Sequence, residues 1–400
     1  MFPLQKSLKS TGRKIQAGVV VLFLCGSLAW AGSALTSRAQ GPAMSAGAPA
    51  PTSWRPAKDA RYVGPQACAR CHEQESQTQH ATAMGRALEP VATSEILRAH
   101  AELTFRAGPY TYTITRRGDQ SIYTVTDGRQ TISAPILYAF GQGKAGQTYL
   151  YQRNGKFQET RVSFYRKIKG LDWTIGYERE PPPTLEEAVG REVSTDEARN
   201  CFGCHTTASA SGTQLQLEKM MPGVSCEACH GPGADHVLAM EAKDFKNKRI
   251  FNPGSMNPDE LSQEFCGSCH RSAESVSANS KLRGINSVRF QPYRLFTSRG
   301  HDPFDERLSC TACHNPHQDP KHDEAFYDAK CMACHRSQAS LKSEALAKSE
   351  AEDGRDAKPC PVRQNSCVSC HMPRVEIPGS HTQFTDHRIR ISREGEPFPN

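Results

Sequence analysis

The sequence predicts a mainly α-helical fold with extensive loops and a small antiparallel β insert. Two patterns predict this arrangement. Residues 102–177 alternate between polar and apolar side chains with turn signals between them, and residues from 181 onward contain short helix signals separated by loops. Only 37% of the 400 residues are hydrophobic, and the mean hydropathy is −0.60. A chain this polar is not expected to build one large apolar core from its side chains alone.

The first 31 residues have the composition of a secretory signal peptide. Four cations precede an uncharged apolar run that ends at about Ala31. Cleavage after Ala31, or alternatively after Ala39, would leave an Ala/Pro/Gly/Ser-rich tether over residues 32–60, which is expected to be disordered. Because the uncharged stretch is long enough to span a bilayer, an uncleaved membrane anchor is the alternative.

The β insert is predicted over residues 101–180. Tyr110 to Arg116 (YTYTITR) alternates with period two, and Asn154-Gly155 predicts a hairpin because both residues tolerate a positive φ. Aromatic residues of this region, such as Tyr149 and Trp173, fit either an exposed docking surface or the covered face of a sheet. Their period-two spacing favours the covered face.

Three consecutive prolines at positions 181–183 end the β insert. The following stretch TLEEAVGREVSTDEARN predicts a short helix that leads into Cys201. The rest of the chain has short helices and loops joined by a repeated cysteine motif.

That motif, Cys-x-x-Cys-His, occurs seven times. It is the attachment motif of c-type haem, in which two thiols add to the haem vinyl groups and the histidine binds the iron. A disulfide framework or structural zinc would not require a histidine after every second cysteine, so both alternatives are rejected. The predicted thioether cysteines are Cys68, Cys71, Cys201, Cys204, Cys226, Cys229, Cys266, Cys269, Cys310, Cys313, Cys331, Cys334, Cys367 and Cys370. The predicted proximal iron ligands are His72, His205, His230, His270, His314, His335 and His371.

The motifs place a first haem segment at residues 61–100, before the β insert, and a six-haem region at residues 181–400. Their irregular spacing in the second region excludes a strict structural repeat. Six motifs between Cys201 and His371 are so close together that haem is expected to supply much of the interior there. The whole chain is expected to carry seven haem c groups. This half of the chain is therefore expected not to fold without its cofactor.

Eight histidines outside the motifs are candidates for the second axial ligand of each iron. If the helix at the first motif continues, His80 lies roughly 12 Å along its axis from His72 and should bind a neighbouring haem. The same argument applies to His317, which follows His314 closely. His100 and His322 are the weakest candidates. The favoured distal ligands are His80, His236, His301, His317, His381 and His387.

The formal net charge of +7 overstates the positive charge of the assembled protein. Removing the four signal-peptide cations leaves 7 − 4 = +3, and the propionates of each haem add negative charge. Nucleic acid is therefore not an expected partner. Haem attachment to thiols belongs outside the cytoplasm, which agrees with the signal peptide and predicts a periplasmic or cell-surface location.

Five segments resemble the multihaem c-type cytochromes related to the tetrahaem electron carrier of ammonia-oxidising bacteria. They are YVGPQACARCHEQESQTQH, GVSCEACHGPGADH, RFQPYRLFTSRGH, LSCTACHNPH and CVSCHMPRVEIPGSHTQFTDHRI, and they cover most of Tyr62 to Ile389. The resemblance implies a mainly α fold with loops wrapped around stacked haems. The superfamily also includes hydroxylamine oxidoreductase and pentahaem nitrite reductase. The chain departs from the latter, whose catalytic haem uses a Cys-x-x-Cys-Lys motif, because all seven motifs here end in histidine.

Closely stacked, mostly bis-histidine haems predict an electron carrier that acts between periplasmic or cell-surface redox proteins. A multihaem oxidoreductase that acts on a small nitrogen or sulfur compound at one five-coordinate haem is the alternative, and a structural subunit of a cytochrome assembly is the third reading. The expected partners are an electron donor and an electron acceptor. Membrane association is expected only if the N-terminal segment is retained.

Overall fold

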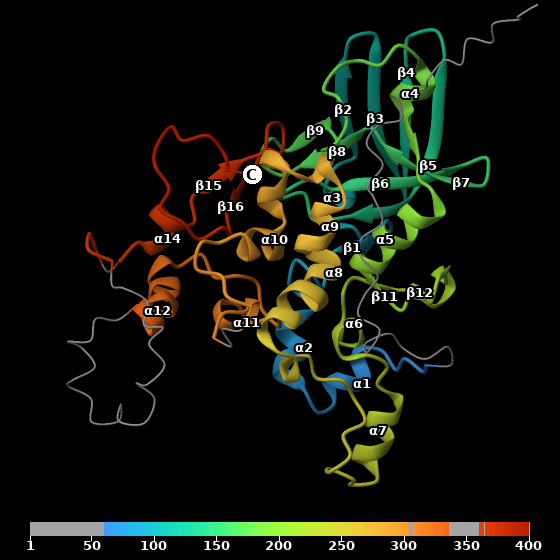
Figure 1. The fold of residues 1–400 in the computed structure, drawn as a ribbon. Helices are drawn as coiled ribbons and strands as arrows, with labels where there is room; N and C mark the ends of the chain where they lie inside the picture. Colours follow the sequence, from blue (N-terminus) through green and yellow to red (C-terminus); the bar gives the residue numbers. More distant parts are fainter. Residues whose placement is uncertain (1–59, 304–306, 336–359, 364, 400) are drawn as a thin grey trace, which may run out of the picture. The chain divides into compact units, whose positions relative to one another are not determined.

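The structure is a computed structural model that describes residues 60–303, 307–335, 360–363 and 365–399 (Figure 1). The predicted signal peptide and nearly all of the predicted tether lie outside the described residues. Among the residues that are described, no helix is both long enough and apolar enough to cross a membrane.

The largest element is a curled antiparallel sheet. Seven of its strands follow one another in the spatial order β10-β7-β6-β5-β4-β3-β2, and β1 pairs with β5 beside this series. The strands are β1 (Leu88–Pro90), β2 (Glu102–Ala107), β3 (Tyr110–Arg117), β4 (Gln120–Thr126), β5 (Thr131–Phe140), β6 (Thr148–Arg153), β7 (Lys156–Thr160) and β10 (Gly190–Glu192). Smaller two-stranded sheets are formed by β8 (Val162–Tyr165) with β9 (Gly170–Trp173), β11 (Thr206–Thr207) with β14 (Met221–Pro222), β12 (Ala210–Ser211) with β13 (Gln214–Leu215), and β15 (Arg374–Glu376) with β16 (Gln383–Thr385).

The hairpin predicted at Asn154-Gly155 is confirmed. Arg153 pairs with Lys156 across the turn, and the two turn residues have φ values of 53° and 74°. Both values are positive, as a two-residue hairpin turn with right-handed strand twist requires.

The aromatic residues of the curled sheet and of the β8–β9 pair are buried. Tyr149, Tyr151 and Tyr165 have no exposed surface, and Trp173 is 5% exposed. They belong with Tyr112 and Tyr123 to the apolar interior of this part of the chain. The interpretation of these aromatics as the covered face of a sheet is therefore confirmed.

The helices are short and mostly carry or flank the cysteine motifs. They are α1 (Pro65–Ala69), α2 (Glu73–Gln79), α3 (Glu95–Ala99), α4 (Leu185–Val189), α5 (Thr195–His205), α6 (Cys226–His230), α7 (Ala234–Glu241), α8 (Gly267–His270), α9 (Ala273–Ser277), α10 (Gln291–Phe296), α11 (Cys310–Cys313), α12 (Glu324–His335) and α14 (Cys367–His371). A π-helical turn, η3 (Glu260–Cys266), runs into α8, and short 3₁₀ turns are η1 (Leu217–Lys219), η2 (Pro253–Ser255), η4 (Ser280–Leu282) and η5 (Gly284–Arg289).

The helix predicted before Cys201 is divided in two. Gly190 ends α4 with a φ of 138° and starts strand β10, after which α5 begins with a capping box. In that box Ser194 accepts a hydrogen bond from the Glu197 amide at 3.2 Å, and the Glu197 carboxylate accepts one from the Ser194 amide at 3.1 Å. The second motif therefore sits on a well-defined helix of its own.

The prediction of a mainly α fold is wrong. The structure has 34% helix and 23% strand, and its largest element is the curled sheet. Each motif needs little more than one helical turn, so the helices stay short. The sheet also extends beyond residues 102–177, because β1 and β10 add strands of three residues that carry no alternating pattern.

Candidate haem-binding sites

Each described cysteine motif lies on a single helical turn or at the end of a short helix. At the first motif, the amides of Cys71 and His72 both donate to the carbonyl oxygen of Cys68, at 3.1 and 2.9 Å. These two hydrogen bonds close the motif into one compact turn, as attachment to a single porphyrin requires. The side chain of Cys334 lies outside the described atoms.

Several motif histidines are oriented by a backbone carbonyl. The Nδ1 atoms of His205, His230 and His371 lie 3.0, 3.1 and 3.0 Å from the carbonyl oxygens of Ala87, Phe251 and Arg390. A carbonyl oxygen only accepts, so Nδ1 carries the proton and Nε2 keeps its lone pair for a metal. Burial lowers the pKa of His205, His230, His270 and His314, which favours the neutral, metal-binding form.

The same arrangement occurs at three histidines outside the motifs. The Nδ1 atoms of His80, His236 and His387 lie 2.6, 2.6 and 3.0 Å from the carbonyl oxygens of Ser76, Lys248 and Thr385. Burial also lowers the pKa of His387 to about 4. These side chains therefore present an unprotonated Nε2, as axial ligands do.

Three motif histidines each face a histidine from elsewhere in the chain. The ring centroids are 6.4 Å apart for His72 and His236, 6.1 Å for His230 and His317, and 6.1 Å for His314 and His387. Two imidazoles that bind one metal from opposite sides at about 2 Å each have centroids about 6 Å apart. The spacing thus leaves room for one iron in each pair.

His317 lies opposite the third motif, although it is only three residues beyond His314 of the fifth. Its contact therefore crosses between motifs, and binding of His317 to a neighbouring haem stays a prediction. For His205, His270 and His371, the described part of the chain contains no imidazole at a comparable spacing.

Two of the favoured distal histidines contact carboxylates instead. The Nε2 atom of His301 lies 3.3 Å from Asp259, and that of His381 lies 2.6 Å from Asp172. Either side chain would have to leave its carboxylate to bind a metal through Nε2.

Cysteines of different motifs interact with one another. A thiol of another motif, together with burial, raises the pKa of Cys68 (beside Cys226), Cys204 (beside Cys269), Cys266 (beside Cys310) and Cys367 (beside Cys331). These four contacts, which we call the thiol contacts, connect the first motif to the third, the second to the fourth, the fourth to the fifth and the sixth to the seventh. Porphyrins attached at these thiols would be immediate neighbours.

The residues present fit a haem. A cavity of about 320 Å³ is lined by Cys313 and His314 of the fifth motif and by Phe326. The buried Nε atom of Arg289 and the Nδ1 atom of His314 have no hydrogen-bond partner. Burial and the nearby Arg271 lower the pKa of Arg289. An anionic propionate would satisfy such a buried guanidinium, so the donor set and the electrostatics both agree with bound haem.

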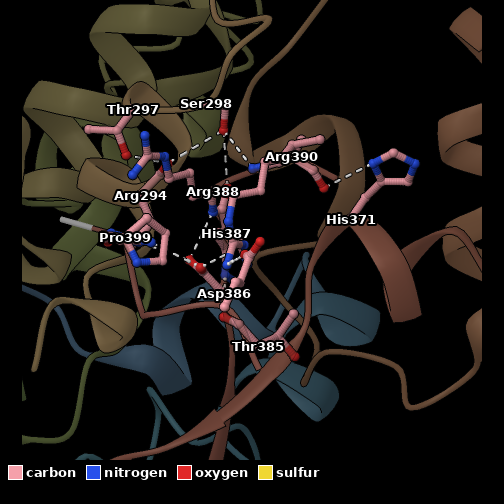
Figure 2. Close-up of polar contacts among 12 residues, drawn as sticks. Arg294, Thr297, Ser298, His371, Thr385, Asp386, His387, Arg388, Arg390 and Pro399 are labelled. Atoms are coloured by element: carbon pink, nitrogen blue, oxygen red, sulfur yellow. Dashed lines mark hydrogen bonds and ion pairs between the residues drawn. The ribbon is translucent and has the colours of Figure 1, made fainter. Parts of the chain in front are cut away.

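A buried ion pair that sequence reasoning missed lies beside His387, the histidine that faces the fifth motif (Figure 2). Arg294 and Asp386 have no exposed side-chain surface and meet through two hydrogen bonds of 2.8 and 2.9 Å. Ser298 donates to the carbonyl oxygen of His387 at 3.3 Å and accepts from the Ile389 amide at 2.8 Å. The sequence signal for this pair is Asp386, which directly precedes the candidate ligand His387. A charged residue beside a buried site usually needs a partner of opposite charge.

Comparison with known proteins gives matches to multihaem cytochromes. The family model described as cytochrome c554 and c-prime matches residues 177–231, which include the second and third motifs. The multiheme cytochrome MtrA of Shewanella baltica is 25% identical over 194 residues, 46% of this chain and 48% of that protein. The dissimilatory sulfite reductase MccA of Wolinella succinogenes is 25% identical over 194 residues, 42% of this chain and 24% of that protein.

Among solved structures, the outer cell wall cytochrome OcwA matches with 16% identity and a TM-score of 0.44, covering 82% of this chain and 79% of that one. The matched segments span about half the length of MtrA and a quarter of that of MccA. The sequence matches and the repeated attachment motif together support a multihaem c-type cytochrome with covalently bound haem c.

Proposed function

We propose that the chain carries seven covalently attached haem c groups and transfers electrons between redox proteins outside the cytoplasm. The observation that carries this proposal is the set of four thiol contacts, because each places two attachment sites side by side. Tyr327 of α12 packs against His314 with ring centroids 5.7 Å apart, which connects the fifth motif to the sixth. Burial and Cys269 of the fourth motif also raise the pKa of Cys229 of the third motif, which relates the third and fourth motifs. The seven motifs then form one series, 1-3-4-5-6-7, with the second motif branching from the fourth.

Three irons would have two histidine ligands each: His72 with His236, His230 with His317, and His314 with His387. When bound, haem iron changes between its ferric and ferrous states with little structural change. Backbone carbonyl oxygens hold His230, His236 and His387 in place through Nδ1. His80 has a free Nε2 and is proposed as a ligand of a further haem, whereas His301 and His381 would first have to leave their carboxylates.

The location and partners follow from the chemistry of attachment. Thioether formation belongs to an exported protein, which agrees with the signal-like N-terminus. The partners would be a donor protein and an acceptor protein, with membrane association if the N-terminal segment is retained.

The similarity to a sulfite reductase favours one alternative, an oxidoreductase with an open iron that acts on a small nitrogen or sulfur compound. In the described residues, His205, His270 and His371 have no second imidazole opposite them, so their irons are the places where such a site would lie.

Mass and spectroscopy of the purified protein test both functions. We expect a mass equal to the polypeptide plus seven haems, low-spin iron by EPR, and no CO binding after reduction. His236→Ala should open one iron, giving a high-spin signal and CO binding at that haem only. The matched control is His322→Ala, an exposed histidine whose removal should change neither spectrum.

Fewer than seven haem increments would contradict the proposed count. CO binding by the reduced wild-type protein would favour the oxidoreductase. An unchanged spectrum in His236→Ala would remove His236 from the ligand set.

A further inference from the structure

We propose that a basic pocket beside the C-terminal hairpin binds a small ligand carrying at least two anionic oxygen groups. The pocket has a volume of about 380 Å³ and contains no motif cysteine or motif histidine. Its lining, which defines the basic pocket, is formed by Lys144, Arg166, Lys167, Arg374, His381, Thr382 and Gln383.

Three segments far apart in the sequence build the basic pocket. Lys144 comes from the loop between β5 and β6, Arg166 and Lys167 from the turn between β8 and β9, and the others from the β15–β16 hairpin. Backbone and side-chain contacts join these segments. The Arg166 amide donates to the Gly143 carbonyl at 2.8 Å, and Lys167 lies 3.8 Å from Glu376 of β15. The pocket is therefore a feature of the folded chain and not of one mobile loop.

The charge of the basic pocket is strongly unbalanced. Its lining contains four lysine or arginine side chains and no carboxylate. Two carboxylates outside the lining pair with these cations: Glu95 lies 3.3 Å from Arg166, and Glu376 lies 3.8 Å from Lys167. The formal charge that remains in the pocket is 4 − 2 = +2. Glu95 is also shared with Arg86 at 2.8 Å. Across the described residues, Lys144 and Arg374 have no acidic partner.

His381 forms a fixed wall of the basic pocket. Its Nε2 lies 2.6 Å from Asp172, and Asp172 also binds Arg179 at 2.6 Å. Its ring packs edge-on against buried Tyr165 with centroids 4.9 Å apart. The residue has a φ of 54°, a conformation that non-glycine residues adopt mainly at special positions such as ligand sites. The wall is thus held in place before any ligand arrives.

The chemistry of the lining selects the ligand class. Guanidinium and ammonium groups bind carboxylate and phosphate oxygens through charge-assisted hydrogen bonds, and Thr382 and Gln383 add neutral hydrogen-bonding groups. The volume is in the range of small-molecule sites. Two unpaired cations on different segments, Lys144 and Arg374, match a ligand with two separated negative groups better than a single small ion.

Calorimetry on the haem-loaded protein tests this site. Pyrophosphate and citrate would be titrated separately at equal ionic strength, with sodium chloride as the baseline. We expect one ligand per chain, and at least a tenfold loss of affinity in the double variant Lys144→Gln/Arg374→Gln. The matched control is Arg117→Gln/Lys281→Gln, which removes two exposed cations elsewhere and should keep wild-type affinity. Unchanged haem content and Soret absorbance confirm that each variant is folded.

Binding of pyrophosphate alone would assign phosphate ligands to the pocket, and binding of citrate alone would assign carboxylate ligands. Both results support the proposal. It is overturned if neither anion binds above the salt baseline, or if the control variant loses as much affinity as the pocket variant. Neither outcome depends on the number of haems or on electron transfer.

Discussion

Arg294 and Asp386 are the most deeply buried opposite charges in the described structure. Both are fully buried, and the guanidinium also donates to the carbonyl oxygen of Pro399 at 2.9 Å and lies 4.5 Å from the ring centre of Phe398 (Figure 2). A buried pair adds little net stability over apolar residues of equal size, but removing one partner leaves an uncompensated charge. Because His387 follows Asp386 directly, the pair also fixes the position of a proposed iron ligand.

Asp386→Asn should therefore lower the free energy of unfolding by about 3–5 kcal/mol, since it leaves Arg294 charged and buried. It should also loosen His387, so that the reduced protein gains CO binding at one haem. Chemical denaturation and CO difference spectra measure the two effects. The control is Asp235→Asn, which removes an ion pair to Arg61 that is 65% exposed on both sides and should cost less than about 1 kcal/mol. A wild-type unfolding curve for Asp386→Asn would contradict this prediction.

At the residue scale, the motif predicts which cysteines and histidines serve haem, because the attachment chemistry dictates their spacing. It does not predict which distal histidine faces which motif. His236 meets His72 and His387 meets His314 only through the fold, and no local pattern links such distant positions. The ion pair of Asp386 could not be predicted for the same reason, because its partner Arg294 lies in another segment.

Strand β10 is only three residues long, but it connects the curled sheet to α5. It pairs with β7 from Gly190 to Glu192, and Arg191 lies 2.9 Å from both Glu159 of β7 and Glu197 of α5. This contact ties the sheet to the helix that carries the second motif. A β-carbon at Gly190 would lie 2.0 Å from the Glu159 carbonyl oxygen, and its φ of 138° is unfavourable for other residues.

Gly190→Ala should destabilise the protein by about 1–3 kcal/mol, because the added methyl group forces β10 away from β7. Thermal unfolding measures the loss, and hydrogen exchange should increase in Lys156–Thr160. Gly170→Ala is the control, because a β-carbon there would make only an ordinary contact of 3.6 Å, and its transition should stay close to wild type. Equal effects of the two substitutions would exclude the steric explanation.

The sequence patterns predict the long hairpins of the sheet but not its edges. Alternation and the Asn154-Gly155 turn are local signals, so β3, β4, β6 and β7 could be anticipated. Strands β1 and β10 are only three residues long and form because a partner strand is already present. The local sequence therefore contains no pattern that predicts them.

In the molecule as a whole, the apolar core is distributed unevenly. The two clusters of buried apolar residues lie almost entirely in the sheet and in α3 to α5, and include Tyr112, Tyr151 and Phe202. Beyond α5, the buried apolar side chains are few and scattered, among them Val276 and Leu295. The later motifs thus lack a side-chain core of their own in the described residues, which agrees with an interior made of porphyrin.

The full-length chain prepared without haem should accordingly keep its sheet and lose the rest. Hydrogen exchange followed by mass spectrometry should show protected amides in β2 to β7 and rapid exchange from α6 to α14, because only the former segment buries enough apolar surface. The haem-loaded protein is the reference. Protection across α6 to α14 in the haem-free chain would refute the role of haem as that region's core.

The thiol contacts also bear on whether haem attachment comes before or after folding of the chain. Two thiols that touch in an oxidising compartment readily form a disulfide, and a cysteine consumed in that way can no longer receive a vinyl group. Cys68 and Cys226, and the three pairs like them, meet only when the chain has already collapsed. We therefore expect haem attachment to precede compaction of the chain, while these cysteines are still apart.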